Sequence, residues 1–213
     1  MQWNSSGVTA AVLGSLKPQI NPKANDLGLY ILGGKGKYGW SVPGQVRRIS
    51  DKHNLNGDEL AKSSQLTSRV DNNVVQDGYN LYQQYFIVTD EGEWTSITQG
   101  MNKNTRRARR YHWHSPTVKS FVETPHTGIV GEKGQPVLNL TDSKADMLRT
   151  NMVGLTKEKP SEVLGHYKDI VMPNRHDVRE QDVNMTRLGS VLNMAYNSDI
   201  DNFEDLVMMK GVG

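Results

Sequence analysis

Apolar positions are densest in the middle of the chain, where their spacing predicts a β-hairpin. Tyr79 to Val88 is rich in Tyr, Phe, Ile and Val, Asp90-Glu91-Gly92 is typical of a turn, and Glu93 to Thr98 returns as the second strand. Both faces of the first strand carry apolar side chains, which indicates a central strand that is covered on both sides. Gln83 and Gln84 then need hydrogen-bond partners, because an unpaired buried amide costs about 1–3 kcal/mol.

Before this hairpin the apolar positions follow mostly helical spacing. The elements predicted there are a helix over 8–16 that Ser5 or Ser6 caps and Lys17-Pro18 ends, a strand over 27–32, a helix with Pro43 in its first turn, and a helix over 58–70. The last helix can continue to Val75, and Asp77-Gly78 then marks a break. A break near Val75 would let Asp77 turn inward beside the hairpin.

After the hairpin the pattern predicts a helix, a second hairpin and a helical tail. Asn102 can cap a helix over 106–113, and the segments 120–131 and 135–140 form the second hairpin, with its turn at Glu132-Lys133-Gly134. We therefore expect an α+β fold in which a mixed, largely antiparallel sheet of hairpins packs with helices. That core domain spans residues 1–141, and a helical region spans 142–213.

Composition narrows the class of protein. The 213 residues contain no cysteine, which excludes disulfides, thiolate metal sites and cysteine nucleophiles. The chain has neither a signal peptide nor a membrane-spanning apolar run, so we expect a cytoplasmic protein; its oligomeric state is not predicted. The formal net charge is only +2, but Lys103 to Arg110 carries five positive charges and no carboxylate. Such a local patch can attract phosphates.

Two basic segments are candidate phosphate-binding sites. Lys35 and Lys37 stand in the glycine-rich segment GGKGK, where the backbone can approach a ligand closely; the alternative is an ordinary solvated loop. On a helix, Arg106, Arg109 and Arg110 would share one face, and a nucleic-acid backbone would relieve their mutual repulsion. The alternative is a basic face that acidic residues elsewhere in the fold neutralise.

Two histidines and two aspartates are candidates for chemistry. Asp71, Asp77, His112 and His126 could bind a divalent metal ion, for which Mg²⁺ or Mn²⁺ is expected before Zn²⁺. His112 could also act as a general base, with Asp77 as its catalytic partner. The alternatives are that the histidines satisfy buried backbone groups and that Asp77-Gly78 is an ordinary turn.

The end of the chain, FEDLVMMKGVG, is similar to the first helix and hairpin of a helix-hairpin-helix motif. In that motif, amide groups of glycines such as Gly211 and Gly213 would face phosphate oxygens of DNA. The sequence stops where the second helix should begin.

Several segments in matching order resemble the prokaryotic domain-of-unknown-function family 763. They are WNSSGVT, LGLYILGGKGK, VDNNVVQDGYNLY, ITQGMN, RRYHW and SFVETPH. The resemblance covers nearly the whole chain and implies a fold and a DNA context, but no reaction. Family members have a further N-terminal segment and continue past GVG, so we expect a fragment or a reduced, viral version. The resemblance also implies that His114 varies within the family, and we therefore expect His112 to be the functional histidine of the two.

These features predict a nucleic-acid-processing protein, with a metal-dependent nuclease that acts on DNA as the leading hypothesis. One alternative is a non-catalytic DNA- or RNA-binding module that uses the same basic residues. The other is a structural or interaction protein in which the polar residues form a buried network.

Overall fold

The computed structural model describes residues 3–131, 137–166 and 183–212. It separates into two compact units, residues 1–143 and 144–213, which are treated one at a time. The first unit is α+β, as the sequence predicts, and the described part of the second is helical.

The first unit is built on an antiparallel sheet of five strands in the order β1-β2-β3-β4-β5. The strands are β1 (Leu29–Lys35), β2 (Asn80–Thr89), β3 (Trp94–Asn102), β4 (Arg107–His114) and β5 (Gly128–Val130). The predicted hairpin is therefore confirmed as β2 and β3, and β2 lies inside the sheet between two neighbours.

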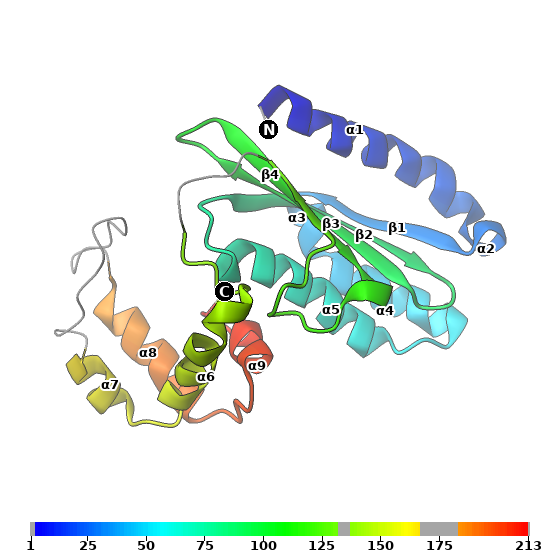
Figure 1. The fold of residues 1–213 in the computed structure, drawn as a ribbon. Helices are drawn as coiled ribbons and strands as arrows, with labels where there is room; N and C mark the ends of the chain where they lie inside the picture. The colour runs from blue at the N-terminus through cyan, green and yellow to red at the C-terminus, as the bar shows by residue number, and fades with distance from the viewer. Residues whose placement is uncertain (1–2, 132–136, 167–182, 213) are drawn as a thin grey trace. The chain divides into compact units, whose positions relative to one another are not determined.

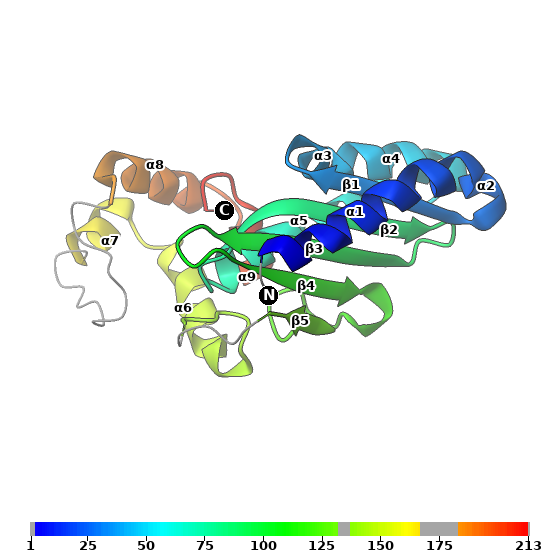
Figure 2. The same cartoon turned by 90° about the horizontal axis from the view of Figure 1, so that it is seen from above.

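Helices cover both faces of this sheet (Figures 1 and 2). Helix α1 (Trp3–Ile20) lies across one face, and α4 (Val42–His53) and α5 (Gly57–Arg69) lie against the other (Figure 1). The shorter helical elements are η1 (Asn21–Lys23), α2 (Ala24–Leu27), α3 (Lys37–Trp40), a π-helical turn η2 (Val70–Val74) and η3 (Ser115–Thr117). We call the two faces of the sheet the α1 face and the α5 face.

The main core lies between the α5 face and the two helices. Large side chains such as Phe86 and Trp113 are fully buried there, together with Val46 and Leu66 from the helices. Removing that much apolar surface from water supplies about 1.5–3 kcal/mol for each such side chain. On the opposite face, the hydroxyl of Tyr85 donates a hydrogen bond to the backbone oxygen of Ala10 in α1.

Two of the elements predicted to follow the β2–β3 hairpin do not form in the structure as described. Residues 107–114 form strand β4 instead of a helix, because they pair with β3 along its length and bury Tyr111 and Trp113 on alternate positions. Asn102 ends β3, and its side-chain oxygen accepts hydrogen bonds from Asn104 N and Thr105 N in a turn. Cross-strand pairing has overridden the local helix preference of the arginines and alanine.

The second predicted hairpin is also absent from the described residues. Strand β5 has three residues and pairs with β4, residues 137–139 are not in a strand, and the predicted turn at 132–134 lies outside the described residues. Two boundaries also differ. Helix α1 passes through Pro18 and ends at Ile20, and β1 includes Gly33 and Gly34.

The short turn η4 (Ser143–Ala145) spans the boundary between the units, and the described helices of the second unit are α6 (Asp146–Leu155), α7 (Pro160–His166), α8 (Met185–Tyr196) and α9 (Phe203–Met208). Asn184 and Asn202 cap α8 and α9 by accepting hydrogen bonds from backbone amides. Gly211 follows α9 with a positive φ of 96°, and Gly213 lies outside the described residues. No described helix in either unit has the length and apolar character that a membrane crossing requires.

Candidate nucleic-acid interface

Strand β4 divides the predicted site residues between the two faces of the sheet. Side chains alternate along a strand, so Arg109 points to the α5 face with Tyr111 and Trp113, whereas Arg110 and His112 point to the α1 face. The shared arginine face that a helix would have produced does not exist. Arg106 lies in the turn before β4, where it is exposed and has a φ of 53°.

On the α5 face, Asp71 is fully buried and is surrounded by hydrogen-bond donors. The π-helical turn η2 carries Asp71 to a point where Nε2 of His126 lies 2.5 Å from its Oδ1. Its Oδ2 accepts hydrogen bonds from Thr98 Oγ1 at 2.5 Å and from Trp113 Nε1 at 3.0 Å. Burial raises the pKa of the Asp71 carboxyl, and the hydrogen bonds and charge of His126 act in the opposite direction.

Asp77 forms a second buried group on the same face. The π-helical turn ends at Val74, and Asp77 turns inward, as a break in the helix near Val75 predicts. Its Oδ2 accepts hydrogen bonds from Arg109 Nη1 at 2.8 Å and Tyr111 Oη at 2.6 Å. Its Oδ1 accepts one from Tyr79 N at 3.2 Å, which is the turn role of Asp77. Burial and the Asp77 charge raise the pKa of Tyr111 above its ordinary value.

The four predicted metal ligands do not share one site. His112 lies on the α1 face, whereas the donors around Asp71 and Asp77 already occupy oxygens of both carboxylates. In residues 3–131, 137–166 and 183–212, no three His, Asp or Glu side chains are grouped so that they could hold a metal ion. A Mg²⁺ or Mn²⁺ ion bound by all four residues therefore does not fit this arrangement, and we derive no chemistry through it.

On the α1 face, Arg110 contacts two neutral groups. Its Nε donates a hydrogen bond to His112 Nε2 at 2.8 Å, and its Nη1 donates one to Thr9 Oγ1 in α1. Because arginine is always protonated, His112 must accept at Nε2 and carry its proton on Nδ1. Burial, followed by the charge of Arg110, lowers the pKa of His112, which favours this neutral form.

A polar row crosses the sheet from Arg110 to the edge strand β1. Arg110 pairs with Gln99 in β3, Gln99 with Gln83 in β2, and Gln83 with Lys35 in β1. Gln83 donates from Nε2 to Gln99 Oε1 at 3.3 Å, and Gln99 donates from Nε2 to Tyr82 Oη at 2.7 Å. Oε1 of Gln83 is buried and has no hydrogen-bond partner among the described residues. On the other face, Gln84 Nε2 donates a hydrogen bond to Ser64 O.

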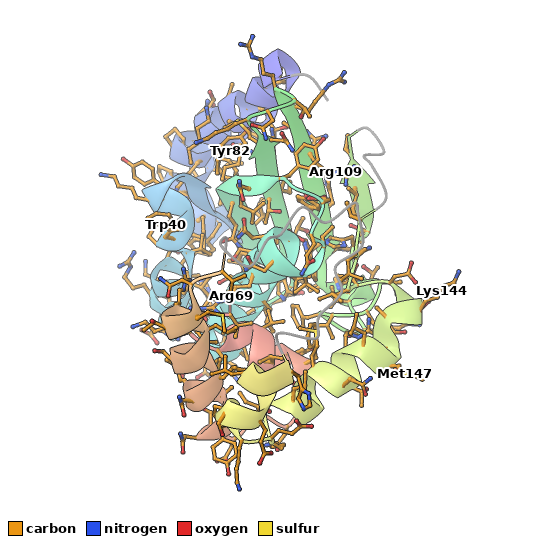
Figure 3. All side chains as sticks on the ribbon, turned by 90° about the vertical axis from the view of Figure 1, so that its left-hand side faces the viewer. Trp40, Arg69, Tyr82, Arg109, Lys144 and Met147 are labelled. Atoms are coloured by element: carbon orange, nitrogen blue, oxygen red, sulfur yellow. The ribbon has the colours of Figure 1, made fainter. Side chains whose placement is uncertain are left out.

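The row ends at a basic–aromatic turn, which we define as residues 35–40. Lys35 and Lys37 are exposed there, Tyr38 is 58 % exposed and Trp40 is 86 % exposed. Nζ of Lys37 lies 5.6 Å from the centre of the Tyr38 ring. In Figure 3, Trp40 lies at the end of α3, and Tyr82 lies between α3 and α1.

Glycines fold this turn back against the sheet. Gly33 has a φ of 82°, and a Cβ on it would lie 2.2 Å from Gln84 O, so a larger residue would separate β1 from β2. The amide of Gly36 then donates a hydrogen bond to Tyr82 O at 2.8 Å. This explains the GGKGK segment as a close approach of backbones that presents its two lysines to solvent.

Sequence reasoning missed three residues of the α1 face and the turn: Thr9, Tyr38 and Trp40. The two aromatic residues were detectable, because they directly follow the lysines in the segment KGKYGW. Thr9 had no such signal, because only the packing of α1 on the sheet brings it to Arg110.

The comparisons with known proteins agree with the resemblance of the sequence segments. Neither a search of curated proteins nor a search of solved structures gives a significant match. A family model described as "Protein of unknown function (DUF763)" matches residues 1–213. The chain belongs to this family.

Proposed function

We propose that the protein binds single-stranded nucleic acid, with bases stacked on the basic–aromatic turn. The observation that carries the proposal is Trp40, whose side chain is 86 % exposed beside two exposed lysines. A large aromatic side chain is normally mostly buried, so a tryptophan held in solvent needs a reason. Proteins that bind single strands without sequence preference use such aromatic platforms next to cationic groups.

The charge around the turn also supports an anionic partner. Residues 27–50 contain four cationic residues, namely Lys35, Lys37, Arg47 and Arg48, and no carboxylate. Only Arg47 among them has an ion pair within the described residues, with Asp58 at 2.7 Å. Exposed cations without local carboxylates attract the phosphates of a strand and give a binding constant that falls with salt.

Hydrolysis of the strand is not part of this proposal. His112 is the only one of the predicted catalytic and metal residues on the α1 face, and its Nε2 already accepts a hydrogen bond from Arg110. Asp77 lies on the other face and is bound to Arg109 and Tyr111. The non-catalytic alternative from the sequence therefore fits the geometry better than the nuclease, which stays a prediction that an assay with Mg²⁺ or Mn²⁺ can test.

The test is the affinity of the full chain for a fluorescently labelled oligo-dT, measured by anisotropy. We expect Trp40→Ala to weaken binding by about 5- to 150-fold, since one base–aromatic stack contributes about 1–3 kcal/mol. Trp40→Phe should retain part of the affinity. An oligonucleotide that quenches tryptophan fluorescence in the wild type and not in Trp40→Ala would locate the contact.

Matched controls separate the turn from general surface effects. Leu27→Ala removes an exposed apolar side chain, and Lys62→Ala removes an exposed lysine from α5; both should bind as the wild type does. Trp40→Ala should melt at the wild-type temperature, because so exposed a side chain contributes little packing. Wild-type affinity in the folded Trp40→Ala protein would overturn the proposal.

A further inference from the structure

Arg110 differs from Arg109 and Arg149 in the groups that its guanidinium contacts. Arg109 lies 2.8 Å from Asp77, and Arg149 lies 3.3 Å from Asp146. Arg110 is only partly exposed, yet its two partners, His112 and Thr9, are neutral. Among the residues that the structure describes, no carboxylate oxygen forms an ion pair with Arg110.

Such an arrangement is unfavourable unless an anion completes it. A charge that is partly removed from water loses hydration, and protein interiors normally compensate with an opposite charge. Arg110 uses one of its five N–H groups on His112 and one on Thr9, so three N–H groups, including both on Nη2, have no partner within the described parts of the chain. A bidentate contact uses two parallel N–H groups of the guanidinium, which donate to two oxygens of a phosphate.

His112 and Thr9 hold the guanidinium in one orientation. The neutral imidazole accepts from Nε and fixes one edge of the plane, while the Thr9 hydroxyl in α1 fixes Nη1. Neither partner neutralises the charge. The pair therefore orients a cation and leaves its charge available to a ligand, as a phosphate-binding site requires.

We propose that Arg110 binds a backbone phosphate of the same strand whose bases stack on the basic–aromatic turn, with His112 and Thr9 as positioning residues. The inference rests on the proposed function for the identity of the ligand. Lys35 and Arg110 stand in register on strands three spacings apart, or about 14 Å, and the side chains of Gln83 and Gln99 between them are buried in the sheet. A strand of a few nucleotides can reach from one to the other.

The first test separates the contribution of the Arg110 charge to binding from the contribution of its planar geometry. Arg110→Lys keeps the charge and loses the planar fork, so oligo-dT binding should weaken by about tenfold or more with an unchanged salt dependence. Arg110→Gln removes the charge, so the slope of log K against log salt should also fall by about 0.7. Trp40→Ala should weaken binding without changing that slope. Arg187→Gln removes the same charge from an exposed position on α8 and should leave both quantities unchanged.

The second test examines His112 as a positioning residue. His112→Ala should weaken oligo-dT binding by about three- to tenfold, because the guanidinium loses one of two fixed contacts. The side-chain oxygen of Gln can accept from Arg110 Nε, so His112→Gln should recover most of the affinity. This pair of variants also carries the test if the Arg110 variants do not fold, which circular dichroism and thermal melting would show.

The outcomes distinguish this inference from the proposed function. Wild-type affinity and salt slope in Arg110→Gln, with weakened binding in Trp40→Ala, would overturn the phosphate site and keep the stacking turn. In the reverse outcome, the protein does not bind oligo-dT, but calorimetry shows that it binds inorganic phosphate and that Arg110→Gln abolishes this binding. That outcome would keep the phosphate site and overturn the nucleic-acid strand as its ligand.

Discussion

The two faces of the sheet differ in whether their arginine is paired with a carboxylate. On the α5 face, Asp71 and Asp77 are enclosed by donors, and Arg109 has a carboxylate partner. On the α1 face, Arg110 is oriented by neutral groups and has no described ion pair. Adjacent positions on β4 thus belong to two different polar groups: one in which charges are paired within the fold, and one in which we propose that a ligand supplies the anion.

The largest effect is expected at Asp71. Asp71→Ala leaves the imidazole of His126, the hydroxyl of Thr98 and the indole N–H of Trp113 without their acceptor, and each buried group that loses its partner costs about 1–3 kcal/mol. Urea unfolding followed by tryptophan fluorescence measures this loss. Asp58→Ala, which removes an exposed carboxylate paired with Arg47, is the control and should cost far less. Similar losses in the two variants would contradict a structural role for Asp71.

The next effect compares the two adjacent arginines. Arg109→Met leaves the buried carboxylate of Asp77 without a cation, so we expect a loss of about 3 kcal/mol in the free energy of unfolding. Arg110→Met leaves no buried carboxylate without a partner and removes a partly buried charge. The free energy of unfolding should therefore fall by less than about 1 kcal/mol or even rise. Equal losses from the two substitutions would remove the distinction between the faces.

The smallest effect is the contribution of His112 to the pH dependence of stability. Its pKa is lowered in the fold by burial and by Arg110, so the unfolded chain binds more protons when the pH falls below about 6.5. This contribution to stability is complete above the unfolded pKa and is lost as the pH falls through the folded pKa. The melting temperature should therefore fall less between pH 7.5 and 5.0 in His112→Gln than in the wild type. An identical fall in both proteins would contradict the neutral imidazole.

The sequence predicted the elements whose signals are local. The β2–β3 hairpin has a turn sequence and a continuous apolar strand, and α5, predicted over 58–70, has a regular apolar stripe. Strand β4 was mistaken for a helix because Arg and Ala favour helices by themselves. Tyr111 and Trp113 two residues apart were a signal of alternation, and reading it would have separated Arg109 from Arg110.

The candidate site depended on pairing that is not visible in the sequence. Asp71 and His126 are 55 positions apart, and they meet because a π-helical turn and the segment after β4 both approach the α5 face. Arg110 and Thr9 are 101 positions apart and meet because α1 crosses the sheet. Both contacts therefore depend on packing between segments far apart in the chain, which local sequence patterns do not report.

The most direct test of the division between the faces is the affinity of Arg109→Lys and Arg110→Lys for the same oligo-dT, in one buffer and at matched folded fractions. Both variants keep the charge of the chain, so only the position and geometry of the guanidinium differ. The proposed phosphate contact of Arg110 predicts that Arg110→Lys binds at least about tenfold more weakly than the wild type and that Arg109→Lys binds as the wild type does. Equal affinities in the two variants, or a greater loss in Arg109→Lys, would contradict it.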